Sequence, residues 1–148
     1  MNARDLTTGA MITIGAGILL FIDGLLPWFR TCFNGLGINT CASGNAWDKP
    51  FSLLAMLLTL ALVAEVIAVQ LANVTLPDLG SVTWGQVRLG ASVAVLALIA
   101  LQLIIGADPL SRYVFLYLGV VLAAVLVFGT VQRNREAVKA PPSAPVQP

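Results

Sequence analysis

The sequence predicts an all-α fold: an integral membrane four-helix bundle with a short disulfide-braced extracytoplasmic loop between its first two helices. Hydrophobic residues make up 58% of the 148 residues and charged residues only 10%, whereas a soluble domain carries about 25% charged residues. Four apolar stretches each approach the roughly 20 residues that cross a hydrocarbon core. Both cysteines lie in the segment between the first two stretches, which is rich in Gly and Asn.

The four predicted spans form one transmembrane domain over residues 1–133. They run over residues 8–29, 51–73, 89–107 and 113–132. Because lipid cannot pair with backbone polar groups, each span is expected to be a helix. The first span is longer than the apolar region of a signal peptide, and no small-residue cleavage pattern follows it, so it is predicted to be retained. Residues 134–148 are proline-rich and are predicted to form a disordered cytoplasmic tail.

Basic residues near the span ends predict the orientation. With both termini in the cytoplasm, the inner side carries five basic residues and the outer side three. The inner residues are Arg4, Arg88, Arg133, Arg135 and Lys139, and the outer residues are Arg30, Lys49 and Arg112. Aromatic residues near the predicted interfaces fit an aromatic belt; they are Trp28, Trp47, Trp84 and Tyr113. The sequence therefore predicts a multi-pass plasma-membrane protein with both termini cytoplasmic.

The first loop, residues 30–50, is expected to be compact and irregular, because its Gly and Asn residues suit turns. Pro27 helps to end the first span. Cys32 and Cys41 are predicted to form a disulfide, since disulfides persist outside the cytoplasm. Closing so small a ring contributes about 2.5 to 3 kcal/mol in the chain-entropy model. A redox-active pair is the alternative, but such chemistry favours Cys-x-x-Cys and needs a second cysteine pair to relay electrons.

Two resemblances follow from this region. Leu-Pro-Trp at 26–28, then a loop with two cysteines and a tryptophan, then three more spans, resembles the plan of claudins and related tetraspan proteins. The loop is much shorter than a claudin's and lacks the Gly-Leu-Trp pattern, so no residue roles are carried over. Residues 26–29 and 47–52 are also similar to a pattern in small actinobacterial four-helix membrane proteins. That resemblance implies a fold and a host, and no function.

Two carboxylates interrupt the predicted spans. A membrane-embedded carboxylate costs about 2.5 to 3.5 kcal/mol on insertion scales, so each should have a partner. Asp23 lies near the outer end of its span, where Arg30 or Arg112 is expected to meet it. Glu65 lies in the inner third of the second span, and Arg88 begins the third. Because one short loop joins these two spans, Glu65 is predicted to pair with Arg88 or a polar group, in a structural role.

Small residues mark faces on which membrane helices approach closely. Ala61, Ala68 and Ala72 share the face of Glu65 at helical spacing, which predicts that this face lies in an interface. Similar stripes on the first and fourth spans are Gly9, Thr13, Gly17 and Gly24, and Gly119 and Ala123. Gln102 offers a neutral hydrogen-bonding group on the third span.

Composition excludes several functions. The sequence contains no histidine, which removes the commonest general base and metal ligand. Two cysteines cannot build a zinc site, no phosphate-binding glycine loop is present, and a net charge of +1 gives no basic face for nucleic acid. The sequence therefore predicts no catalytic residues, no metal and no cofactor.

The leading functional hypothesis is a non-enzymatic accessory subunit or scaffold, acting through helix contacts and the outer loop. Its expected partners are the lipid bilayer and other membrane proteins or a second copy, and no small-molecule substrate is assignable. One alternative is a small oligomeric proton-coupled transporter or channel that uses Glu65. The other is a membrane thiol-disulfide oxidoreductase.

Overall fold

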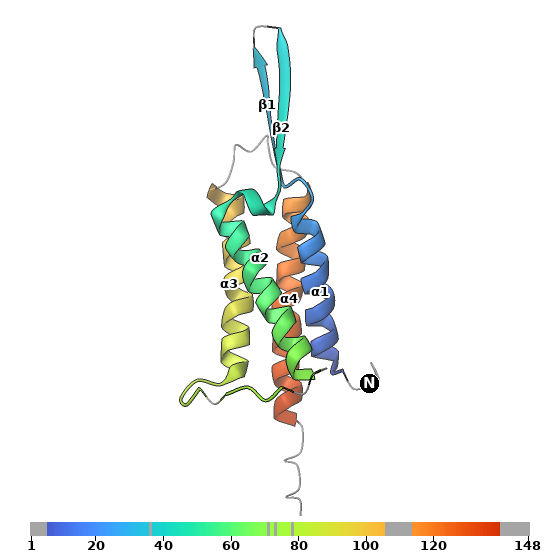
Figure 1. The fold of residues 1–148 in the computed structure, drawn as a ribbon, viewed down its shortest axis with the longest axis vertical. Helices are drawn as coiled ribbons and strands as arrows, with labels where there is room; N and C mark the ends of the chain where they lie inside the picture. Colours follow the sequence, from blue (N-terminus) through green and yellow to red (C-terminus); the bar gives the residue numbers. More distant parts are fainter. Residues whose placement is uncertain are drawn as a thin grey trace, which may run out of the picture.

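The structure, a computed structural model, describes residues 6–35, 37–70, 72, 74–77, 79–105 and 114–139. Within them it contains four α-helices and one two-stranded antiparallel sheet. The elements are α1 (Thr8–Gly24), β1 (Phe29–Gly35), β2 (Ile38–Gly44), the short 3₁₀ helix η2 (Ala46–Asp48), α2 (Pro50–Gln70), α3 (Trp84–Ile105) and α4 (Val114–Lys139). The prediction of four helices is therefore confirmed, and a small sheet amends the all-α prediction (Figure 1).

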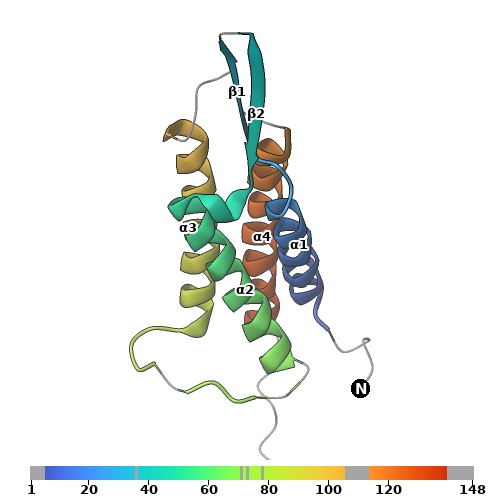
Figure 2. The ribbon, with the colours of Figure 1, turned by 45° about the horizontal axis from the view of Figure 1, so that its top comes forward.

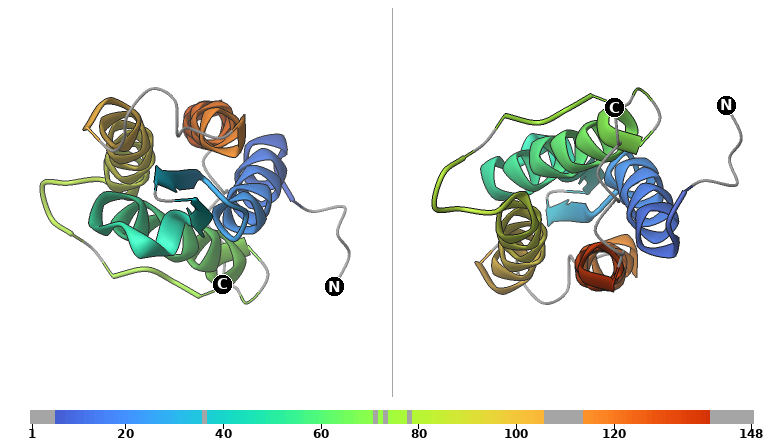
Figure 3. Two further views of the ribbon diagram at one scale, coloured as in Figure 1. Left: turned by 90° about the horizontal axis from the view of Figure 1, so that it is seen from above. Right: turned by 90° about the horizontal axis from the view of Figure 1, so that it is seen from below.

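The four helices form a ring in which each contacts its two neighbours in chain order and α1 closes on α4. The most extensive helix contact is between α1 and α4. Figure 3 shows the ring along its axis, and Figure 2 shows the hairpin of β1 and β2 standing beyond one end of it. The start of α1 and the end of α4 lie at the opposite end (Figure 1).

Short-range contacts explain where the helices begin. The Thr7 hydroxyl caps α1 by accepting a hydrogen bond from the Ala10 N–H at 3.3 Å. Pro50 occupies the first position of α2, where a proline loses no helical hydrogen bond. Thr83 and Gln86 form a reciprocal capping box at the start of α3, with distances of 3.3 and 3.1 Å.

The helix boundaries differ from the predicted spans. The first helix ends at Gly24 rather than near residue 29, because the chain turns there and enters β1. The third begins at Trp84, earlier than residue 89, and the fourth continues beyond residue 132 to Lys139. The rest of the expected tail, residues 140–148, lies outside the described residues. By length and composition α2, α3 and α4 can cross a membrane, while α1 is a shorter apolar helix of 17 residues.

The first loop is an ordered β-hairpin, so the expectation of an irregular loop is wrong. β1 and β2 pair antiparallel, with Phe29 opposite Gly44 and Gly35 opposite Ile38. Gly37 in the connecting turn has a φ of +79°, which suits glycine. The Gly and Asn residues that indicated irregular structure are concentrated near this turn and at the hairpin base, and the strands between them pair regularly.

The core at the hairpin end is built around Trp28. Its side chain is fully buried, so the prediction that it belongs to an interfacial aromatic belt is wrong. Its backbone N–H donates to the Gly44 carbonyl at 3.0 Å, which fixes the base of the hairpin to the bundle. Trp47 packs edge-on against Phe21, with ring centroids 5.7 Å apart. Tyr113 lies outside the described residues.

Candidate functional site

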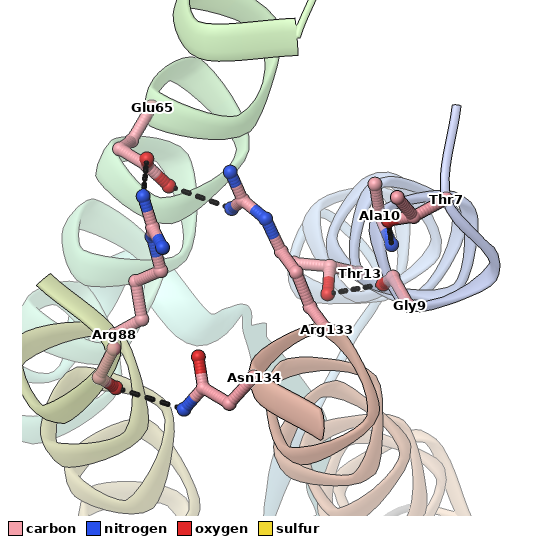
Figure 4. Close-up of polar contacts among 9 residues, drawn as sticks. Thr7, Gly9, Ala10, Thr13, Glu65, Arg88, Arg133 and Asn134 are labelled. Carbon is pink, nitrogen blue, oxygen red and sulfur yellow. Dashed lines mark hydrogen bonds and ion pairs between the residues drawn. The ribbon is translucent and has the colours of Figure 1, made fainter. Parts of the chain in front are cut away.

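Glu65 is the centre of an ion-pair network that joins three helices (Figure 4). Its Oε1 accepts a hydrogen bond from Arg88 Nη2 of α3 at 2.6 Å. Its Oε2 accepts from Arg133 Nη1 of α4 at 2.9 Å. The two guanidinium groups approach the carboxylate from different helices, so each oxygen has its own charged donor. Such charge-assisted bonds are about twice as strong as neutral ones.

The network is largely shielded from its surroundings and carries a net positive charge. The side chain of Arg133 is 6% exposed, and those of Glu65 and Arg88 are 14% and 15% exposed. One carboxylate faces two guanidinium groups, so the three side chains together carry one excess positive charge. Among the described residues, Arg88 Nε has no hydrogen-bond partner. Both carboxylate oxygens of Glu65 therefore accept a hydrogen bond, whereas the Nε–H of Arg88 has no acceptor among the described residues.

Residues adjoining Arg133 extend the polar contacts to α1 and α3. Asn134 Nδ2 donates to the Gly85 carbonyl at 3.0 Å. Glu136 accepts from the Gly9 N–H at 3.1 Å, at the N-terminus of α1, where a negative charge is favoured. Arg133, Asn134 and Glu136 thus connect the last turns of α4 to every other helix.

Arg88 lies where the sequence predicts a partner for Glu65, whereas Arg133 was not expected there. Its position just after the fourth predicted span assigned it to the inner membrane surface. Helical spacing is the feature that predicts burial of Arg133. Buried residues recur along α4 at intervals of four, three and four, at Gly119, Ala123, Leu126 and Thr130, and Arg133 is the next position on the same face.

The alanine stripe, which continues past the end of α2 to Ala72, is not buried within the bundle. Ala61 and Ala72 are exposed and Ala68 is half-buried. The buried face of α2 instead contains Ser52, Ala55, Met56, Thr59, Leu62 and Val66. Glu65 borders this face, and its flexible side chain carries the carboxylate inward to the arginines.

The glycine stripes of α1 and α4 do lie in helix interfaces. Gly9, Thr13, Gly17 and Gly24 are buried, as are Gly119 and Ala123. A Cβ on Gly9 would collide with the backbone of Arg133, and a Cβ on Gly119 would lie 2.8 Å from the Trp28 ring. These glycines allow α1 and its following turn to approach α4 closely.

Among the described residues, Asp23 is bound by Trp28. The indole N–H donates to Asp23 Oδ2 at 3.2 Å and to the Asp23 carbonyl at 2.9 Å. Asp23 is 2% exposed, and among the described residues its Oδ1 has no hydrogen-bond partner. Arg30 lies on β1 of the hairpin, and Arg112 lies outside the described residues. Gln102 is also buried, on α3, at 4% exposure.

The two cysteines form the predicted disulfide. Cys32 and Cys41 are directly opposite each other in the hairpin, with Cα atoms 4.0 Å apart. Alternation along the strands places the disulfide on one face and Phe33 and Ile38 on the other. Both apolar side chains are largely exposed, at 69% and 63%. The part of the chain that the structure describes holds no cluster of three or more metal-ligating His, Cys, Asp or Glu residues.

Comparison with known proteins adds no assignment: no protein-family model, no curated protein and no solved structure matches the chain.

Proposed function

We propose that this chain is a non-enzymatic multi-pass membrane protein that presents its hairpin to a partner protein outside the membrane, as an accessory subunit or scaffold. The observation that supports it most directly is the apolar face of the hairpin. Phe33 and Ile38 share this face, beyond the helix ends, and are exposed at 69% and 63%. Large apolar side chains grouped at an exposed site are typical of contact surfaces.

Membrane insertion is supported by the distribution of side chains over the bundle. The buried positions include many polar residues, among them Thr13, Ser52, Thr59, Ser92, Gln102 and Thr130. The outer faces carry large apolar side chains, among them Ile18, Leu19, Leu57, Val121, Val125 and Phe128. A water-soluble bundle has the opposite pattern. Lipid accounts for the apolar exterior, and at about 1.5 Å per residue α2, with 21 residues, extends about 31 Å.

The paired state of Glu65 supports a structural role over proton-coupled transport. A transporting carboxylate has to exchange partners, whereas both oxygens of Glu65 accept hydrogen bonds from arginines on neighbouring helices. Transport through Glu65 would require this network to open and would expose two guanidinium groups within the bundle. The thiol-oxidoreductase alternative lacks support, because the chain has only two cysteines and they are bonded to each other.

Site-specific photocrosslinking in native membranes tests the proposed contact. A photoreactive benzoylphenylalanine replaces Phe33 or Ile38 on the apolar face, or Asn34 or Asn39 on the opposite face. The first two positions should crosslink to the same protein, and the two asparagine positions, which are also exposed, should not. Equal crosslinking from both faces, or crosslinks to lipid alone, would refute the proposal. A crosslinked dimer would identify the partner as a second copy.

A further inference from the structure

A largely apolar groove lies between α3 and α4, at the end of the bundle that is far from the hairpin. Its volume is about 380 Å³. The lining residues are Leu89, Val131, Asn134, Arg135, Val138 and Lys139. Apolar and cationic side chains therefore share one open groove.

The groove has a deep apolar part and a cationic rim. The hydrogen bond from Asn134 to the Gly85 carbonyl places Asn134 level with the first turn of α3. Leu89 and Val131 lie about one turn further into the bundle. Arg135 is next to Asn134, and Lys139 is one turn further out, toward the end of α4.

The two rim cations are available for an external anion. Arg135 and Lys139 are exposed, and neither forms an ion pair with a carboxylate among the described residues. They are four residues apart on one helix, so their charges lie on the same face and repel each other. An anion between them would remove this repulsion.

We propose that the groove binds an anionic phospholipid, with its phosphate at Arg135 and Lys139 and an acyl chain along Leu89 and Val131. The inference rests on the membrane placement proposed above. The two cations favour an anionic headgroup. The apolar residues of the groove lie deeper in the bundle and the cations lie at its end, which is the arrangement that an amphiphile needs. Basic groups near a membrane surface each favour anionic lipid by a few-fold.

Native mass spectrometry of the purified full chain tests this site. The protein is mixed with equal amounts of phosphatidylglycerol and phosphatidylcholine that have the same acyl chains. The wild type should retain phosphatidylglycerol preferentially, and Arg135→Gln or Lys139→Gln should each lower the ratio about fivefold. Lys49→Gln is the matched control, because it removes an exposed lysine at the other end of the bundle and should leave the ratio unchanged.

The outcomes separate the lipid site from the membrane placement. A wild-type ratio near one, or an unchanged ratio in the Arg135→Gln/Lys139→Gln variant, would overturn the lipid site. An equal loss in Lys49→Gln would also overturn it, since the preference would then be diffuse attraction. Alkaline carbonate extraction tests the membrane placement separately: release of the chain from membranes refutes the placement itself, whereas retention without a lipid preference refutes only the groove.

Discussion

At Glu65, one carboxylate is the counter-charge for two arginines that lie, charged, among apolar helices. Arginine remains protonated in proteins, so its buried charge has to be paired. The cost of removing the carboxylate is therefore set mainly by what the two guanidinium groups lose. The contacts at 2.6 and 2.9 Å therefore predict whether each substitution lowers the stability of the bundle.

Glu65→Leu should destabilise the folded bundle by about 3 to 5 kcal/mol, because it leaves two buried cations without a counter-charge. Glu65→Gln should cost less, since its amide oxygen still accepts a hydrogen bond from one arginine. The measurement is the free energy of unfolding in mixed micelles during denaturing-detergent titration.

A double-mutant cycle provides the control for this prediction. Arg133→Met removes one of the cations, so Glu65→Leu combined with Arg133→Met should lose less stability than the sum of the two single changes. Additive losses, or a Glu65→Leu variant as stable as the wild type, would show that the contacts at Glu65 do not hold the bundle together.

The sequence predicts one of the two ion pairs at Glu65, the one with Arg88. Glu65 and Arg88 were paired correctly because a charge inside a span needs a partner and adjacent spans are neighbours. Arg133 could not be placed by hydropathy, which assigns a basic residue after a span to the membrane surface. Its burial depends on the rotation of α4 about its axis, and only the spacing from Gly119 through Thr130 carried that information.

Among the helices, the contact of α1 with α4 depends on glycines where the backbones approach closely. A Cβ on Gly129 would lie 2.8 Å from Thr13 Oγ1 and 3.0 Å from the Thr13 backbone nitrogen. A backbone atom cannot rotate away as a side chain can, so relief requires the helices to separate. Gly15 of α1, by contrast, has nothing within 4 Å of the Cβ it lacks.

Gly129→Ala should therefore destabilise the bundle by about 1 to 3 kcal/mol, the usual cost of overpacking. Gly15→Ala is the matched control, and it should be neutral or stabilising by up to about 1 kcal/mol, because alanine favours a helix. Thermal unfolding in detergent measures both. Equal effects at the two positions would mean that helix propensity, and not close packing, determines the result.

Hydropathy predicted which segments become helices but not where each helix begins and ends. Helix ends depend on local caps, and the Thr83–Gln86 capping box was present in the sequence before the predicted start of the third span. The hairpin was missed because its Gly and Asn residues suggested irregular turns. The feature that indicates the hairpin is the position of the two cysteines: Cys32 precedes Gly35 by as many residues as Cys41 follows Ile38, and Gly35 and Ile38 pair beside the turn.

Over the whole molecule, polar contacts between the helices gather at the end opposite the hairpin. There α4 binds α2 through Arg133, α3 through Asn134 and α1 through Glu136. The hairpin end is held by the buried Trp28 and braced by the disulfide. The two ends thus differ chemically, and this difference bears on the orientation of the chain in a membrane.

Two independent features predict the same orientation. A disulfide persists in an oxidising compartment, which predicts a position outside the cytoplasm for the hairpin. Arg135 and Lys139 follow the apolar part of α4 directly, which favours a cytoplasmic position for that end. In a background where both cysteines are serine, Asn39→Cys should react with a membrane-impermeant maleimide in intact cells. Lys139→Cys and Thr83→Cys should react only after the membrane is opened.

The three positions also test the number of spans, because they lie at the two ends of one bundle. Asn39 is on β2, Thr83 immediately precedes α3 and Lys139 ends α4. If only Lys139→Cys and Thr83→Cys react in intact cells, the orientation is the reverse of the predicted one, but the bundle still spans the membrane. Labelling of all three would mean that the bundle does not span the bilayer. Opposite behaviour of Thr83→Cys and Lys139→Cys would show an odd number of crossings between them and would contradict the prediction that α3 and α4 both span the membrane.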